Sequence, residues 1–432
     1  MVTDTCGKGR KAMKVKSKYG LFYKWGKDLH KLDSDKSIIK TELGSQGRLL
    51  LYVNTLFLLA EALSGTFVNV YLWKEAGDYA LIGYYNVAFY LAMQITFMLS
   101  GKWVKVYNKM SCLRSGISVA ASFYLFVLFL GDKAVDYIFP LGFLQGIGHG
   151  FFWFSFNIVL FEITNRENRD KFNGLAGVFG SLVGMAAPLG AGYLISQMTG
   201  MKGYYTIFAI SLGVYIAGVI LSFFLRKRKS GGQFSLKETY AVFNRSKTWK
   251  RIFFAMIGQG INESVFNFLI GILVFVATSN EWKVGIYTFI TSGVAFIAFY
   301  VVGKYIRPSW RNQAMFWGAI LMSVSVLPLF YDVNYNTLLW MGIGISLFSP
   351  LFFIPAVSIV FDAIGKSKEA AKWKVEDIII RETGLNVGRL LSLGAFILLV
   401  SWSEKPLILN SLLLAVSLAQ LITWFFMRKV KL

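Results

Sequence analysis

Long runs of apolar residues alternate with shorter polar segments from residue 49 to the end of the chain. Each run is long enough to cross a hydrocarbon core of roughly 30 Å as a helix that rises about 1.5 Å per residue. The pattern predicts an all-α integral membrane protein with twelve transmembrane helices. The predicted spans are 49–73, 79–100, 113–131, 137–161, 173–196, 204–225, 252–277, 283–303, 312–330, 336–361, 380–402 and 406–427.

The composition agrees with a membrane protein and argues against several other classes. Of the 432 residues, 55% are hydrophobic and 16% are charged, whereas soluble domains are roughly 45–50% apolar and about 25% charged. The two cysteines, Cys6 and Cys112, do not form a CxxC motif, and only two histidines are present. We therefore expect no disulfide framework, no metal site and no cofactor. The chain also lacks a glycine-rich phosphate loop, so we do not expect an enzyme.

The basic residues lie in alternate loops. Of the 45 lysines and arginines, 39 fall on the side of the predicted bundle that carries both termini, and five fall on the opposite side. This asymmetry follows the positive-inside rule, so the net charge of +22 does not indicate nucleic-acid binding. It predicts a multi-pass protein of the cell membrane with both termini in the cytoplasm, and basic loops that contact anionic lipid headgroups.

The longest polar connection falls in the middle of the chain and predicts two halves. We expect a basic N-terminal segment, 1–48, a first six-helix half, 49–225, a linker, 226–251, a second half, 252–427, and a tail, 428–432. In the first segment, apolar residues share one helical face and predict a helix lying on the membrane surface. These residues are Leu21, Phe22, Trp25, Leu29 and Leu32.

An internal repeat supports the division into halves. With a shift of 202 residues, the first two helices of each half align without a gap. The matches include Glu61 with Glu263, Gly83 with Gly285, and Gly101 with Gly303. A shift of 200 also aligns Phe161-Glu162 with Phe361-Asp362. Six-plus-six repeats place a substrate site between the halves, near the middle of the bilayer.

The loop after the second predicted helix resembles a motif of the major facilitator superfamily, roughly G-x-x-x-D-R-x-G-R-R. GKWVKVYNKM supplies Gly101 and Lys109 but has Lys105 where the family has aspartate. The second copy, GKYIRPSWRN, supplies Gly303, Arg307 and Arg311. The resemblance covers about residues 49–427 and implies that these six residues take part in gating. We expect the two glycines to permit close backbone packing.

Two further stretches extend the resemblance. GSLVGMAAPLGAG is similar to the Gly-Pro motif associated with antiporters in the family, although its glycine and proline are not adjacent. FEITNRENRDKFNGLAG and IIIRETGLNVGR resemble a Gram-positive branch of uncharacterised facilitators. Neither stretch indicates a substrate.

Ionisable residues near the middle of predicted spans are the candidates for function. Such side chains are costly in the bilayer and usually face a cavity or a partner. Glu61 and Glu263 each continue a stripe of polar or small residues at steps of four, and in the family these two helices line the cavity. We expect Glu61 to carry a proton and Glu263 to bind substrate, although either carboxylate could serve only to bond helices together. The other candidates are Asn69, Gln145, His149, Trp153, Gln259 and Asn267.

The eleventh predicted span contains Glu382 and Arg389. These residues lie seven positions apart and share a helical face. Arg389 lies about two helical turns inside the membrane and needs a counter-ion or an anionic ligand. We predict that the two residues form a pair, which could bind substrate or simply stabilise the cytoplasmic end of the helix.

The favoured function is a proton-coupled secondary transporter that works by alternating access on an unidentified small molecule. A flippase for a lipid or lipid-linked precursor is an alternative that the aromatic helices permit. A membrane scaffold that docks a partner enzyme would suit the basic N-terminal segment. Titratable groups in mid-membrane favour transport, because a scaffold gains nothing from their cost. We expect a monomer.

The charge asymmetry predicts the topology directly. Reporter fusions at the N-terminus, within 226–251 and at the C-terminus should all report a cytoplasmic location, because each follows or precedes a strongly basic segment. Fusions near Lys133 and Lys202 serve as controls and should report the opposite side. An external location for the central linker would contradict the twelve-helix arrangement.

Overall fold

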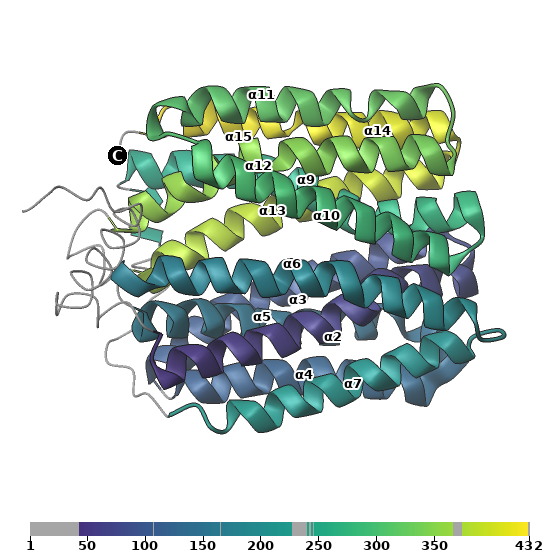
Figure 1. Ribbon diagram of the computed structural model, residues 1–432, viewed down its shortest axis with the longest axis horizontal. Coiled ribbons are helices and arrows are strands. Elements are labelled where there is room, and N and C mark those ends of the chain that lie inside the picture. The colour runs from purple at the N-terminus through teal and green to yellow at the C-terminus, as the bar shows by residue number, and fades with distance from the viewer. Residues whose placement is uncertain are drawn as a thin grey trace, which may run out of the picture.

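The computed structural model describes residues 43–106, 108–164, 166–226, 240–241, 243–244, 246–365 and 374–430. Its long helices run roughly parallel in one bundle (Figure 1). The first half contains α2 (Ser45–Ala76), α3 (Tyr79–Val106), α4 (Lys109–Leu130), α5 (Ile138–Ile163), α6 (Arg166–Ser196) and α7 (Lys202–Ser222). The second half contains α9 (Lys247–Thr278), α10 (Glu281–Tyr305), α11 (Arg311–Val324), α12 (Tyr335–Gly365), α13 (Lys374–Trp402), α14 (Pro406–Leu418) and α15 (Gln420–Met427).

The prediction of twelve membrane-crossing helices is confirmed for the described part of the chain. Eleven segments are long and apolar enough to cross a bilayer, and one of them, Lys109–Leu160, contains both α4 and α5. A short 3-10 helix, Gly131–Tyr137, joins these two helices. The last crossing consists of α14 and α15 in succession. Helices suit this environment because they satisfy every backbone hydrogen bond within one segment.

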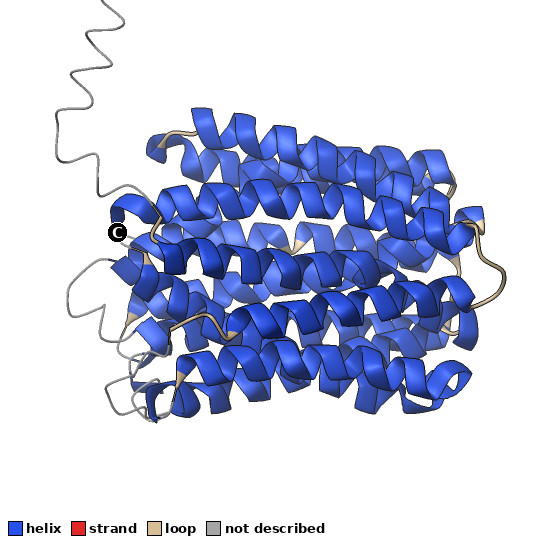
Figure 2. Cartoon of the chain, turned by 60° about the horizontal axis from the view of Figure 1, so that its bottom comes forward, coloured by secondary structure: helices blue, strands red, loops and turns tan. Residues whose placement is uncertain are grey.

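The two halves lie side by side, with α2–α7 on one side of the bundle and α9–α15 on the other (Figure 1). Figure 2 shows the described chain as helices joined by short loops. The backbone N–H of Arg226, after α7, donates to Gln46 Oε1 in α2 at 2.9 Å. Arg251, in α9, donates to the Lys429 carbonyl after α15. Each half therefore begins and ends at the same end of the bundle, here called the linker end.

Glycines bring helices into close contact within the first half. Gly142, Gly146 and Gly150 lie on one face of α5, and this face packs against α3. A Cβ added at Gly146 would lie 2.1 Å from the Phe89 carbonyl oxygen, and one at Gly150 would lie 2.7 Å from Thr96 Cβ. These small residues allow the two helices to pack closely.

Glycines also mark the contact between the halves, where α3 packs against α13 and α6 packs against α10. A Cβ at Gly83 would lie 2.6 Å from Ile397 Cγ1, and one at Gly285 would lie 2.8 Å from the Pro188 carbonyl oxygen. The internal repeat aligns these two glycines, so both halves use the same position to contact each other.

A polar contact joins the halves at the end of the bundle opposite the linker end. Lys74, in the last turn of α2, lies with its Nζ 3.0 Å from Glu281 Oε1, in the first turn of α10. The Tyr204 hydroxyl donates to the same carboxylate oxygen at 2.9 Å. The sequence does not predict this ion pair, because both charged residues fall in short segments between the predicted spans, and no pattern connects segments so far apart in the chain.

The structure corrects the expectation for Gly303. A Cβ at this position would meet only Ile354 Cδ1, at 3.8 Å, so no close backbone packing occurs there. At this position α10 has room for a side chain next to α12. The packing there would therefore tolerate a residue larger than glycine. Gly101 is buried in α3.

Some predictions fall on other parts of the chain. The surface helix predicted within 1–48 and most of the linker lie outside the described residues. The boundaries 49–225, 226–251, 252–427 and 428–432 stay predictions.

The two glycines of the second half should respond differently to substitution. Gly285→Ala should reduce the free energy of unfolding by about 1–3 kcal/mol, because the new methyl group must push backbone atoms apart. Gly303→Ala should be neutral or stabilise the protein, since alanine favours the helix by up to about 1 kcal/mol where space is available. Thermal unfolding of the purified variants measures both effects. Equal melting temperatures would contradict this description of the contact between the halves.

Candidate functional site

Glu61 lies near the middle of α2 and contacts two titratable side chains from other helices. The Tyr215 hydroxyl, on α7, donates to Glu61 Oε1 at 2.5 Å. His149 Nε2, on α5, lies 3.0 Å from the same oxygen. This distance is that of an ion pair, although the two groups are not aligned for a hydrogen bond. A carboxyl, an imidazole and a phenol therefore meet at one point, and protons can pass among groups at these separations.

Aromatic rings hold His149 in place. Its ring meets Phe57 and Phe89 edge-on, with centroids 5.3 and 5.0 Å apart. Trp153, one turn further along α5, packs against the same Phe57 ring and lines neither of the two cavities described below. Of the candidate residues on this helix, His149 thus lies next to Glu61, while Trp153 belongs to the aromatic packing.

A cavity of about 170 Å³ lies beside Glu61. It is rich in carboxamides: Asn69, Asn86 and Gln145 come from the first half and Asn267 comes from the second. The Asn86 amide donates to Asn69 Oδ1 at 3.3 Å, and the Tyr85 hydroxyl donates to Gln145 Oε1. The remaining lining residues are Gly65, Val68, Tyr85, Phe89 and Phe268.

Glu263, the repeat partner of Glu61, has a different set of contacts. Gln259 Nε2 donates to Glu263 Oε1 at 2.7 Å, as the spacing on one helix suggested. Arg389 Nη2, on α13, donates to Glu263 Oε2 at 2.7 Å. Both carboxylate oxygens are therefore occupied, and the charge of Glu263 is matched within the second half.

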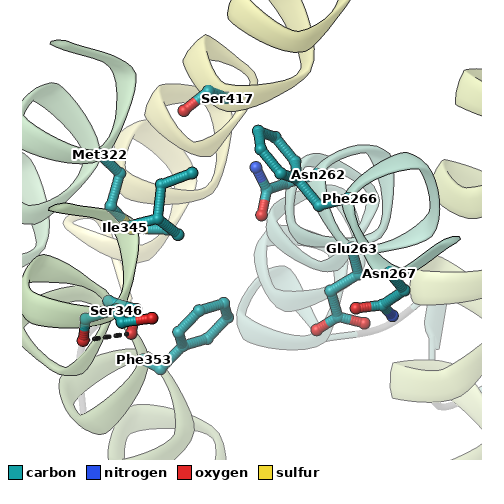
Figure 3. Close-up of a pocket in the computed structure, with 10 residues that line it drawn as sticks. Asn262, Glu263, Phe266, Asn267, Met322, Ile345, Ser346, Phe353 and Ser417 are labelled. Atoms are coloured by element: carbon teal, nitrogen blue, oxygen red, sulfur yellow. Dashed lines mark hydrogen bonds between the residues drawn. The ribbon is translucent and has the colours of Figure 1, made fainter. Parts of the chain in front are cut away.

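Glu263 lines a second cavity, of about 210 Å³ (Figure 3). Figure 3 shows the carboxylate and the Asn267 amide side by side on α9, facing α12 across the cavity. Asn267 also lines the cavity of Glu61, so it lies between the two sites. The remaining lining residues are Asn262, Phe266, Met322, Ile345, Ser346, Ser349, Phe353 and Ser417.

The predicted pairing of Arg389 with Glu382 is wrong. Arg381 Nη1 contacts Glu382 Oε1 at 2.9 Å. Arg389, on α13, instead pairs with Glu263 on the neighbouring helix α9. Residues seven apart share a helical face but are separated by about 10 Å along the axis, which is too far for direct contact. Spacing along one helix did not reveal the counter-ion on the neighbouring helix.

Arg389 also joins the network that connects the two halves. Its Nη1 donates to Asn386 Oδ1 at 3.0 Å, and its guanidinium lies over the Tyr90 ring of α3 at 5.0 Å. The Asn386 amide donates to Gln94 Oε1 at 2.8 Å, and Gln94 Nε2 donates to Thr383 Oγ1 at 2.9 Å. Sequence reasoning missed Tyr90 and Gln94, because single polar residues on an apolar helix carry no periodic signal.

The loop cations predicted to act in gating occupy repeated positions. Lys109, at the start of α4, pairs with Glu162 near the end of α5. Its counterpart Arg311 lies with Nη1 2.8 Å from Asp362 Oδ2, near the end of α12. The first pair joins α4 to α5 and the second joins α11 to α12, in each case at the linker end of the half. The guanidinium of Arg307 lies over the Trp310 ring, 5.4 Å from its centroid. The side chain of Lys105 is not among those that the structure describes.

Comparison with known proteins decides the family. The sequence model described as the Major Facilitator Superfamily matches residues 50–372. The chain belongs to the major facilitator superfamily. The resemblance to this family that the sequence indicates is thereby confirmed. Membership makes this multi-pass membrane protein a transmembrane transporter for a small molecule, and not an enzyme.

The relatives of this facilitator that match in sequence are uncharacterised. The uncharacterised protein YqgE of Bacillus subtilis (strain 168) is 34% identical over 382 residues, which cover 88% of this chain and 89% of YqgE. An uncharacterised protein encoded in the sodM 3′ region of Geobacillus stearothermophilus is 44% identical over 160 residues, 37% of this chain and 75% of that protein. Both agree with the predicted branch of uncharacterised facilitators.

Solved structures share the facilitator fold. A bacterial homologue of the iron transporter ferroportin in an inward-facing state has a TM-score of 0.64 at 14% identity, covering 89% of this chain and 98% of that one. Its outward-facing state has a TM-score of 0.63 at 13% identity, covering 90% and 99%. At these identities the likeness concerns the fold alone.

Glu263 and Arg389 should be strongly coupled in stability. Arg389→Leu alone should destabilise the protein, by less than the roughly 3–5 kcal/mol of a fully buried pair, because it strands a partly buried carboxylate. Glu263→Gln combined with Arg389→Leu should cost clearly less than the sum of the single changes. Thermal unfolding of the four proteins gives the coupling energy.

Glu382→Gln provides the matched control for this cycle. Glu382 lies on the same helix as Arg389 but pairs directly with Arg381, so its loss should couple to that of Arg389 much more weakly than the loss of Glu263 does. Coupling of Arg389 to Glu382, without coupling to Glu263, would restore the pairing that we have rejected.

Proposed function

We propose that the protein is a secondary active transporter that couples substrate movement to protons through alternating access. The observation that carries the proposal is the pair of repeat-related carboxylates, Glu61 and Glu263, each of which lines a cavity inside the bundle. A carboxylate inside a membrane-spanning bundle is costly to maintain, and two of them at equivalent positions are readily explained if they carry the transport cycle.

The contacts of the two carboxylates suggest a division of labour. Glu61 lies next to His149 and Tyr215, which can both exchange protons with it. Glu263 is held by Arg389, and arginine does not release its proton at physiological pH. We therefore assign proton binding to Glu61 and substrate binding to the cavity of Glu263.

In this mechanism, a proton enters the Glu61 cavity from one side of the membrane and neutralises the carboxylate. Neutralisation weakens its attraction for His149 and removes the cost of moving a charge through the bundle. The halves then rock about the contacts of α3 with α13 and α6 with α10, and the proton leaves on the other side. Asn267 borders both cavities and so connects the proton state of one with the occupancy of the other.

The iron named for the ferroportin homologue is not carried over to this protein. Within the described residues there is no group of three histidine, cysteine, aspartate or glutamate side chains that could hold a metal ion. We propose a location in the cell membrane with the linker end in the cytoplasm, on the basis of the 39 basic residues assigned to that side.

Glu61→Gln should abolish proton-driven accumulation and preserve exchange of substrate across the membrane. Glutamine keeps the shape and hydrogen bonding of a protonated glutamate, so the halves can still move, but it carries no proton. A substrate is first identified from the rise in melting temperature of the purified protein during a screen of metabolites, drugs and lipids. Proteoliposomes then measure uptake with and without a pH gradient.

Glu75→Gln is the control for this experiment. Glu75 lies at the end of the same helix and lines neither cavity, so its replacement should leave coupled uptake unchanged. Full pH-driven accumulation by the Glu61→Gln protein would exclude Glu61 as the coupling site.

A further inference from the structure

The cavity of Glu263 carries no uncompensated charge. Glu263 is the ionisable residue among its lining side chains, and its two oxygens already accept from Gln259 and Arg389. Arg389 is not one of the residues that line the cavity. An ion entering this space would find its counter-charge already paired.

The walls of the cavity are divided between hydrogen-bonding and apolar groups. The polar groups are the hydroxyls of Ser346, Ser349 and Ser417 and the amides of Asn262 and Asn267. Asn262 already bonds to Val416 and Gln420, Ser349 donates to the Ser346 carbonyl, and Ser417 accepts from Ser323. The Ser346 hydroxyl and the Asn267 amide are therefore the polar groups best placed to bond a ligand. The apolar groups are Phe266, Met322, Ile345 and Phe353. In Figure 3 the Phe353 ring extends from α12 toward Glu263, while Ser346 lies beside it on the same helix. A ligand that fits must offer both an apolar surface and polar edges.

We propose that this cavity selects an uncharged amphipathic molecule, with an aromatic or branched apolar body and hydroxyl or amide groups along its edge. The inference rests on the proposed function, since it names the substrate class of the same site. A carboxylate has about four acceptor positions, so Glu263 retains the capacity to accept from a neutral donor. A cation would have to displace Arg389, and an anion would face the occupied carboxylate, and either arrangement buries an unpaired charge.

Three soluble probes with the same aromatic body test the charge preference. N-acetyltyrosinamide is neutral, tyrosinamide is cationic and N-acetyltyrosine is anionic at about pH 6.0, because an α-amino group titrates at roughly 8 and an α-carboxyl at roughly 3.5. Saturation-transfer difference NMR with the purified full-length protein in lipid nanodiscs reports which probe binds. We expect the neutral probe to bind roughly tenfold more tightly than either ion. A preference for tyrosinamide, or no binding of any of the three at millimolar concentration, would overturn the proposal.

Substitution of Glu263 makes the test specific to the pair. Glu263→Gln leaves the permanent charge of Arg389 without its partner, so the preference should shift toward N-acetyltyrosine. Glu263→Gln combined with Arg389→Gln removes both charges, and the neutral probe should again bind best. An unchanged order of affinity in the single variant would contradict the proposal. If the single variant does not fold, the order of affinity of the double variant still tests the proposal.

Ser346→Phe locates the binding. The larger side chain fills the cavity, so binding of the neutral probe should be lost while the melting temperature shows a folded protein. Retained binding would place the probe elsewhere and overturn the proposal.

None of these measurements needs a pH gradient. Failure of proton-driven uptake with the affinity order intact would therefore refute the proposed function, but not the binding class.

Discussion

A charge buried in an apolar helix bundle needs a partner, and this requirement arranges the interior of the protein. Glu61 is met by His149 and Tyr215 from two helices of its own half. Glu263 is met by Arg389 and Gln259. Since none of these partners can be withdrawn without leaving a group unsatisfied, the positions of α5, α7 and α13 relative to α2 and α9 follow from them. The cavities lie where these fixed helices leave space.

The internal repeat is preserved in the framework and has diverged in the site. Gly83 and Gly285 make the same contact in both halves, and the pairs at the linker end recur as Lys109 with Glu162 and Arg311 with Asp362. The repeat aligns Gly65 of the first half with Asn267 of the second. At this position only the second half therefore places an amide side chain between the two cavities. The two carboxylates thus share a place in the fold while differing in the chemistry that surrounds them.

Much of this could be predicted from the sequence, because hydropathy and basic loops are strong local signals. The helices, the halves, the two mid-membrane glutamates and the contact of Gln259 with Glu263 all follow from spacing along one helix. The partners from other helices could not be predicted. Arg389 was assigned to Glu382 because a single helix offers no other acid on that face, and the contacts of Tyr215, Tyr90 and Gln94 depend on tertiary packing alone.

The ion pair between Lys74 and Glu281 has a consequence for how the protein is made. Its members are 207 residues apart in the chain, so Lys74 must enter the membrane long before the ribosome has synthesised Glu281. The first half is therefore completed before Lys74 and Tyr204 can contact Glu281. The contact with Glu281 can form only after α10 has been made, so docking of the halves at this end is a late step in biogenesis.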